Sequence, residues 1–160
     1  VKNLELILYA AKKLPEVNFT IYGPIEKGYV LKSRLKNVKI INKGYDQKEE
    51  IRELKKNSIF VLPSKREGIP LALMEAMAAG LVCISSNTQG GKELITHEKT
   101  GLLFKKENSE GLIKSLEKVI SSKKEWKKLS INSKNSIKSR TWENISEDLE
   151  KIYKSDIQEI

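Results

Sequence analysis

Apolar residues recur along the chain with two periods, one helical and one extended. From Leu4 to Leu14 they return every three or four positions and Pro15 follows, which predicts an amphipathic helix. The β-branched and aromatic run Val17–Tyr22 ends at Gly23-Pro24 and predicts a strand followed by a turn. Further strands are predicted at 38–41, 58–62, 81–85 and 102–104, and further helices at 26–36, 47–56, 70–79, near 93, 109–120, 123–138 and 142–158.

This order of elements indicates an α/β fold. Helices that alternate with short β-branched strands are typical of βαβ units, whose right-handed crossovers give a parallel sheet covered by helices on both faces. The chain of 160 residues has the size of one such domain, and no low-complexity linker divides it. We therefore expect residues 1–160 to form a single domain.

The composition shows that the chain is strongly basic. The 30 Lys and Arg residues outnumber the 21 Asp and Glu residues, which gives a net charge of +9. The lysines are scattered, so a solvated surface is favoured over attraction to nucleotide phosphates, anionic lipid or nucleic acid. The single cysteine, Cys83, lies in an apolar run and is expected to pack as a small hydrophobe in a reducing compartment.

The candidate chemistry lies where predicted strands end. Ligands of parallel α/β sheets bind outside the carboxyl ends of the strands, and the richest loop there is 64–70. Pro70 near the first helical position has no amide proton to leave unbonded. The amides of Ile69, Leu71 and Ala72 should point out of the helix end, where they suit an anion or a sugar hydroxyl.

Two carboxylates mark this segment. Glu67 precedes the predicted helix and Glu75 lies about a turn and a half inside it, so the two can bind different parts of one long ligand. Carboxylates accept hydrogen bonds from vicinal diols, which ribose and hexose both present. On spacing alone, helix capping by Glu67 and surface exposure of Glu75 explain the pair better.

The surrounding motifs change that balance, because they resemble those of the family-four retaining glycosyltransferases of the GT-B fold. Glu67 and Glu75, with seven residues between them, match the family's paired-glutamate motif, and the resemblance spans essentially the whole chain. The other matching segments are Lys2-Asn3-Leu4-Glu5, Gly23-Pro24, Pro63-Ser64, Gly68-Ile69-Pro70, Ala76-Met77-Ala78-Ala79-Gly80, Gly90-Gly91-Lys92-Glu93-Leu94-Ile95, Thr100-Gly101-Leu102-Leu103-Phe104, Trp142 and Tyr153.

The resemblance implies a Rossmann-like, donor-binding C-terminal domain and gives residues their roles. Glu75 would bind the ribose hydroxyls and Glu67 the donor sugar, as a catalytic positioner without acting as the nucleophile. The backbone from Gly68 to Leu71 would support the sugar and the diphosphate. Lys2 would pair with the diphosphate, on which charge grows as the glycosidic bond breaks. The loop that contains Tyr45 would contact the base.

The resemblance also implies what surrounds the site. The donor would be a UDP-, GDP- or ADP-sugar, with no cofactor and no metal, and a hexose would pass to a glycan or lipid-linked acceptor. The acceptor domain and the family's first strand would precede Val1, so a chain complete as given should have a gap beside Val17–Tyr22. The family's acceptor-side histidine belongs to that preceding domain. His97 is therefore not expected to take its role, and is expected to lie in the loop between Ile95 and Thr100 without a catalytic function. A cytoplasmic enzyme, with peripheral association at the inner face of the membrane, fits this assignment.

Three other interpretations stay open. A catalytically silent nucleotide-sugar-binding domain would carry the same motifs. A sugar-nucleotide epimerase shares the architecture, but the Glu67–Glu75 spacing fits transferases better. A basic nucleic-acid-binding module would explain the charge, although the chain lacks the aromatic stacking platform of such modules. We therefore expect no nucleic-acid partner.

Overall fold

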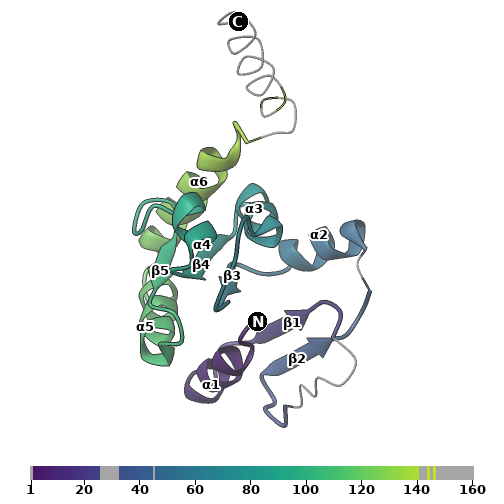
Figure 1. Ribbon diagram of the computed structural model, residues 1–160. Coiled ribbons are helices and arrows are strands. Elements are labelled where there is room, and N and C mark those ends of the chain that lie inside the picture. The colour runs from purple at the N-terminus through teal and green to yellow at the C-terminus, as the bar shows by residue number, and fades with distance from the viewer. Residues whose placement is uncertain (1, 26–32, 45, 141–143, 145, 147–160) are drawn as a thin grey trace, which may run out of the picture.

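The computed structural model describes residues 2–25, 33–44, 46–140, 144 and 146. Within these ranges helices and strands alternate as the sequence predicts, and the α/β class is confirmed (Figure 1). The elements are α1 Glu5–Lys13, β1 Phe19–Tyr22, β2 Val38–Ile41, α2 Gln47–Lys55, β3 Ile59–Leu62, α3 Leu71–Ala78, β4 Val82–Ser86, α4 Gln89–Leu94, β5 Leu102–Phe104, α5 Ser109–Ile120 and α6 Lys123–Ile137.

Two predicted helices fall partly or wholly outside the described residues. The helix expected at 26–36 lies mostly in the undescribed stretch 26–32, and residues 33–36, which are described, are not helical. The helix expected at 142–158, with Trp142 and Tyr153, lies outside the described residues apart from 144 and 146.

Every strand pairing among the described residues is parallel, but the strands form two sheets. β1 pairs with β2, and β4 lies between β3 and β5. β1 and β3 are not hydrogen-bonded to each other, so each has one edge without a strand partner in the described part of the chain. The two sheets divide between β1 and β3.

Helices cover both faces of the β3–β4–β5 sheet, because alternate residues of each strand point to opposite sides. In β4, Val82 and Ile84 pack with buried residues of α1 and α5. Cys83, between them, packs with α3 and α4 on the other face. All five residues of β4 are buried, and α6 contributes to both clusters. The doubly covered sheet expected from the sequence is therefore present.

The Cys83 side chain has the environment that the sequence predicts. It is fully buried, and burial raises the pKa of its thiol to about 12. Because only the thiolate is nucleophilic, the native chain should be inert toward Ellman's reagent at pH 8. The same chain unfolded in guanidinium chloride should react at once. Rapid modification of the native chain would show that this core opens readily.

Candidate functional site

Three loops meet at the carboxyl ends of β3, β4 and β5 and form a pocket of about 510 Å³. The loops follow directly from the parallel strands, whose ends lie side by side at one edge of the sheet. The residues that line the pocket are Lys65, Arg66, Glu67, Gly68, Thr88, Gln89 and Lys106.

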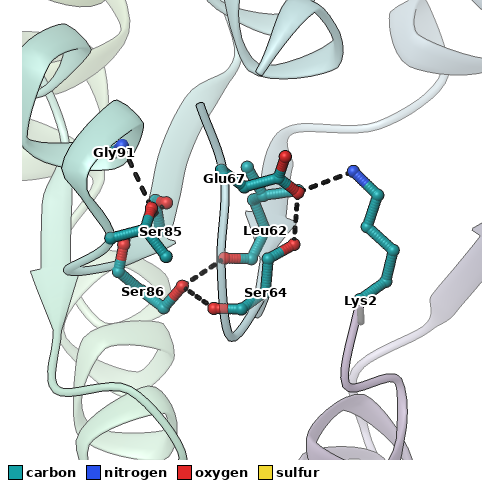
Figure 2. Close-up of polar contacts among 8 residues, drawn as sticks. Lys2, Leu62, Ser64, Glu67, Ser85, Ser86 and Gly91 are labelled. Atoms are coloured by element: carbon teal, nitrogen blue, oxygen red, sulfur yellow. Dashed lines mark hydrogen bonds and ion pairs between the residues drawn. The ribbon is translucent and has the colours of Figure 1, made fainter. Parts of the chain in front are cut away.

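Glu67 lies at the centre of a polar network in this loop cluster (Figure 2). Its Oε1 atom accepts a hydrogen bond from Ser64 Oγ at 2.6 Å and pairs with Lys2 Nζ at 2.7 Å. The Glu67 side chain is only 15% exposed, whereas that of Lys2 is 57% exposed. The pair joins positions 65 residues apart, and its lysine end is open to solvent.

Strand β4 anchors the segment that carries Glu67. Ser86 Oγ, at the end of β4, donates a hydrogen bond to the carbonyl of Ser64 at 2.5 Å and a longer one to that of Leu62 at 3.4 Å. Ser64 and Ser86 are fully buried. Ser64 thus has its backbone fixed by β4 while its hydroxyl fixes the Glu67 carboxylate.

The loop that carries Glu67 packs closely against the start of α4, where Gly68 meets Gly90. A Cβ atom added to Gly90 would lie 1.6 Å from the Gly68 carbonyl oxygen and 2.8 Å from Pro70 Cδ. The amide of Gly90 also donates a weak, 3.4 Å hydrogen bond to the carbonyl of Glu67. Only glycine fits at position 90, which explains why the chain needs a small residue where α4 begins.

The loop enters α3 with free backbone donors. Pro70 is the N-cap of α3, whereas the sequence suggested the first helical position, so the helix begins one residue later, at Leu71. The Pro70 carbonyl accepts hydrogen bonds from the amides of Leu73 and Met74. The amides of Ile69, Leu71 and Ala72 make no hydrogen bond to another described residue. The side chains of Ile69 and Leu71 are 67% and 60% exposed, while Pro70 is buried.

Glu75 is held apart from this network. Its carboxylate forms no hydrogen bond or ion pair with the described residues, and it does not line the pocket around Glu67. Burial, with a smaller contribution from the negative charge of Glu50, raises its pKa above the ordinary value. It is a half-buried carboxylate with nothing in the described chain to compensate its charge.

The structure brings some of the predicted residues together and leaves others apart. Lys2 and Glu67 are in contact, and Gly68 lines the same pocket. Tyr45 lies outside the described residues. His97 has a local structural role, because its Nδ1 accepts a hydrogen bond from the Leu103 amide at 2.9 Å and so ties its loop to β5.

Four of the seven lining residues belong to the loop 64–70 that the sequence indicated, but Lys65 and Arg66 were given no role there, and Thr88, Gln89 and Lys106 were not singled out. Lys65, Arg66, Thr88, Gln89 and Lys106 all lie within four residues of a strand end. That placement is the signal that could have identified them, since parallel strands bring such residues to one edge. Only the strand order β3-β4-β5 shows that these three loops are neighbours.

Among the described residues, no group of three or more His, Cys, Asp or Glu side chains could hold a metal ion. No helix in the described ranges has both the length and the apolar character needed to cross a bilayer.

The fold and the loop cluster define a Rossmann-like domain with its site at the carboxyl ends of a parallel sheet. The profile of the glycosyl transferases group 1 matches residues 1–136. The chain belongs to that family.

Individual comparisons agree with this membership. The Escherichia coli UDP-Gal:alpha-D-GlcNAc-diphosphoundecaprenol alpha-1,3-galactosyltransferase is 42% identical over 70 residues, which are 44% of this chain and 18% of that enzyme. The C-terminal domain of a glycosyl transferase group 1 family protein from Francisella tularensis superposes with a TM-score of 0.74 at 22% identity, over 86% of this chain and 76% of that domain. Anabaena HepE, solved in complex with UDP, gives a TM-score of 0.84 at 18% identity, over 96% of this chain and 45% of that protein.

At these low identities the structural comparisons show the fold, which is that of a GT-B C-terminal domain. The chain spans less than half the length of the Escherichia coli relative and of the Anabaena protein.

The glycine contact predicts a strong effect of Gly90→Ala. Because the added Cβ would overlap backbone atoms of Gly68, the loop must shift, and we expect a loss of about 1–3 kcal/mol in the free energy of unfolding. Denaturant titration measures this loss. Gly44→Ala is the matched control, since its Cβ would meet no atom within 4 Å and stability should hardly change. Equal losses in the two variants would contradict the proposed contact.

The environment of Glu75 predicts that Glu75→Gln stabilises the unliganded chain at pH 7. A carboxyl group whose pKa is raised on folding opposes folding once the pH rises through that pKa, and this cost is absent well below the ordinary value of 4.5. We expect a melting temperature higher by about 1–3 °C at pH 7, with the difference lost in acid. Thermal unfolding at both pH values is the measurement.

The matched control for this experiment is Glu117→Gln, which removes the same charge from an exposed position on α5. It should leave the melting temperature nearly unchanged at both pH values. A lower melting temperature for Glu75→Gln at pH 7 would contradict the assignment of Glu75 as an uncompensated charge.

Proposed function

We propose that this chain is the nucleotide-sugar-binding domain of a retaining glycosyltransferase that transfers a hexose to a glycan or lipid-linked acceptor. The observation that carries the proposal is the Lys2–Glu67 pair, set beside the unbonded amides at the start of α3. A cation, a fixed carboxylate and free backbone donors are together the groups that a sugar diphosphate requires.

In this proposal Glu67 positions the donor sugar. Ser64 and Lys2 both contact Oε1, so Oε2 can accept a hydrogen bond from a sugar hydroxyl. Because Ser64 is fixed by β4, the carboxylate should not swing away when the sugar arrives. Glu67 acts on the pose of the sugar and not as a covalent nucleophile.

Lys2 and the amides of Ile69, Leu71 and Ala72 act on the diphosphate. Charge builds on the leaving group as the glycosidic bond breaks, and a cation with nearby backbone donors stabilises that charge. Lys2 is more than half exposed, so it can reach a phosphate while it stays beside Glu67. We propose that these groups supply the positive charge without a metal ion, so donor binding should be insensitive to EDTA.

Glu75 receives the ribose. The uncompensated, half-buried carboxylate gains hydrogen-bond donors when the two ribose hydroxyls bind, which offsets its desolvation. Tyr45 is assigned to the base by the family resemblance. The Escherichia coli relative is named for UDP-Gal as its donor, which supports UDP as the nucleotide among UDP, GDP and ADP.

We propose a lipid-linked acceptor and a reaction at the cytoplasmic face of the membrane. The Escherichia coli relative is a galactosyltransferase whose name specifies a sugar linked to diphosphoundecaprenol. The net charge of +9 also favours approach to an anionic membrane surface.

Binding of UDP and UDP-glucose by calorimetry tests the assigned roles. Lys2→Ala removes the partner of the diphosphate, so both ligands should bind about tenfold more weakly. Glu67→Ala removes a contact to the sugar, so UDP-glucose should weaken while UDP does not. Glu75→Ala should weaken both ligands about tenfold through the ribose.

Matched controls are Lys12→Ala and Glu117→Ala, which change the same charges at exposed positions on α1 and α5. Neither should alter binding of UDP or UDP-glucose. Unchanged binding in Glu75→Ala would refute the ribose assignment, and failure of the unaltered chain to bind UDP-, GDP- and ADP-glucose would refute the proposed function.

A further inference from the structure

The pocket beside Glu67 carries positive charge that the donor site as described does not use. We infer that this pocket, with Arg66 and Lys106, binds the phosphate group of a sugar-phosphate acceptor. The inference rests on the proposed function and extends it to the acceptor side of the same carboxylate.

The charge balance of the pocket singles out two side chains. Four charged residues line it, namely Lys65, Arg66, Lys106 and Glu67. Lys65 is paired with Glu107 at 2.6 Å, and Glu67 is paired with Lys2. Arg66 and Lys106 are exposed and form no ion pair with a described residue. Two cations that form no ion pair with a described residue therefore line one cavity, and such a pair favours a phosphate.

This pocket is distinct from the surface assigned to the donor diphosphate. Its lining shares Glu67 and Gly68 with the proposed donor site, but it includes none of Lys2, Ile69, Leu71 and Ala72, which carry the proposed diphosphate contacts. Figure 2 shows Lys2 on one side of Glu67, and Ser86 with the start of α4 on the other. Thr88 and Gln89, which line the pocket, lie on the α4 side.

Transfer chemistry explains why an acceptor would occupy this place. The acceptor hydroxyl must reach the anomeric carbon of the donor sugar, and Glu67 is assigned to position that sugar. Consider an acceptor sugar beside Glu67 whose own anomeric carbon is linked to a phosphate. That phosphate lies about one sugar ring away from the reacting hydroxyl. A volume of about 510 Å³ accommodates a ligand of this size, and the exposed side chain of Gln89 offers a polar partner for its hydroxyls.

The test uses N-acetylglucosamine 1-phosphate as a water-soluble probe and ligand-observed NMR on the chain. In Arg66→Ala/Lys106→Ala, the probe should bind about tenfold or more weakly at low salt, while UDP-glucose binding stays unchanged. Arg66→Lys/Lys106→Arg keeps both charges and should retain most of the affinity. Lys114→Ala/Lys127→Ala lowers the net charge equally at exposed positions on α5 and α6, and should have no effect.

A competition experiment distinguishes the proposed acceptor-phosphate site from the site of the donor diphosphate. Saturating UDP should leave the probe bound, because the two phosphates occupy different places. Displacement of the probe by UDP would overturn the inference, and so would an equal loss of affinity in the control double variant. Binding of UDP-glucose without any binding of the probe would overturn it and leave the proposed function intact. Failure of UDP-glucose itself to bind would refute the proposed function instead.

Discussion

The packing of the Gly68 carbonyl against Gly90 is the constraint on which the site depends. It brings the loop that follows β3 down onto the start of α4, where Ser86 at the end of β4 can reach the backbone of Ser64. Ser64 in turn fixes the carboxylate of Glu67. The position of the central acidic group is thus set by the neighbouring strand as well as by its own loop, and buried hydrogen bonds make that setting rigid.

The ion pair with Lys2 adds a second dependence. Lys2 precedes α1, which packs against α5 and links the β1–β2 sheet to the β3–β4–β5 sheet. The pair therefore spans two parts of the molecule that no described strand pairing joins. If α1 moved, Glu67 would lose its cation, so the electrostatics of the site depend on the helix packing beneath it.

Under the proposed ribose assignment, function and stability oppose each other at Glu75. An unpaired, half-buried carboxylate costs folding free energy, and nothing in the described chain offsets that cost. Such a residue is explained when a ligand supplies the missing donors. At the basic pocket the imbalance has the opposite sign, since Arg66 and Lys106 line the cavity and neither forms an ion pair with a described residue. The overall charge of +9 conceals these two local imbalances, which matter more for binding than the total.

The sequence determined the order of helices and strands, the two-sided burial of the β3–β4–β5 sheet and the loop that carries Glu67. Those features follow from periodicity, glycine and proline, which act over a few residues. Only the tertiary structure decided the contact of Lys2 with Glu67, the helix boundary at Pro70 and the basic pocket that Lys106 completes. The ion pair and the pocket join loops far apart in the chain, and strand order and helix packing, which no local pattern encodes, bring those loops together.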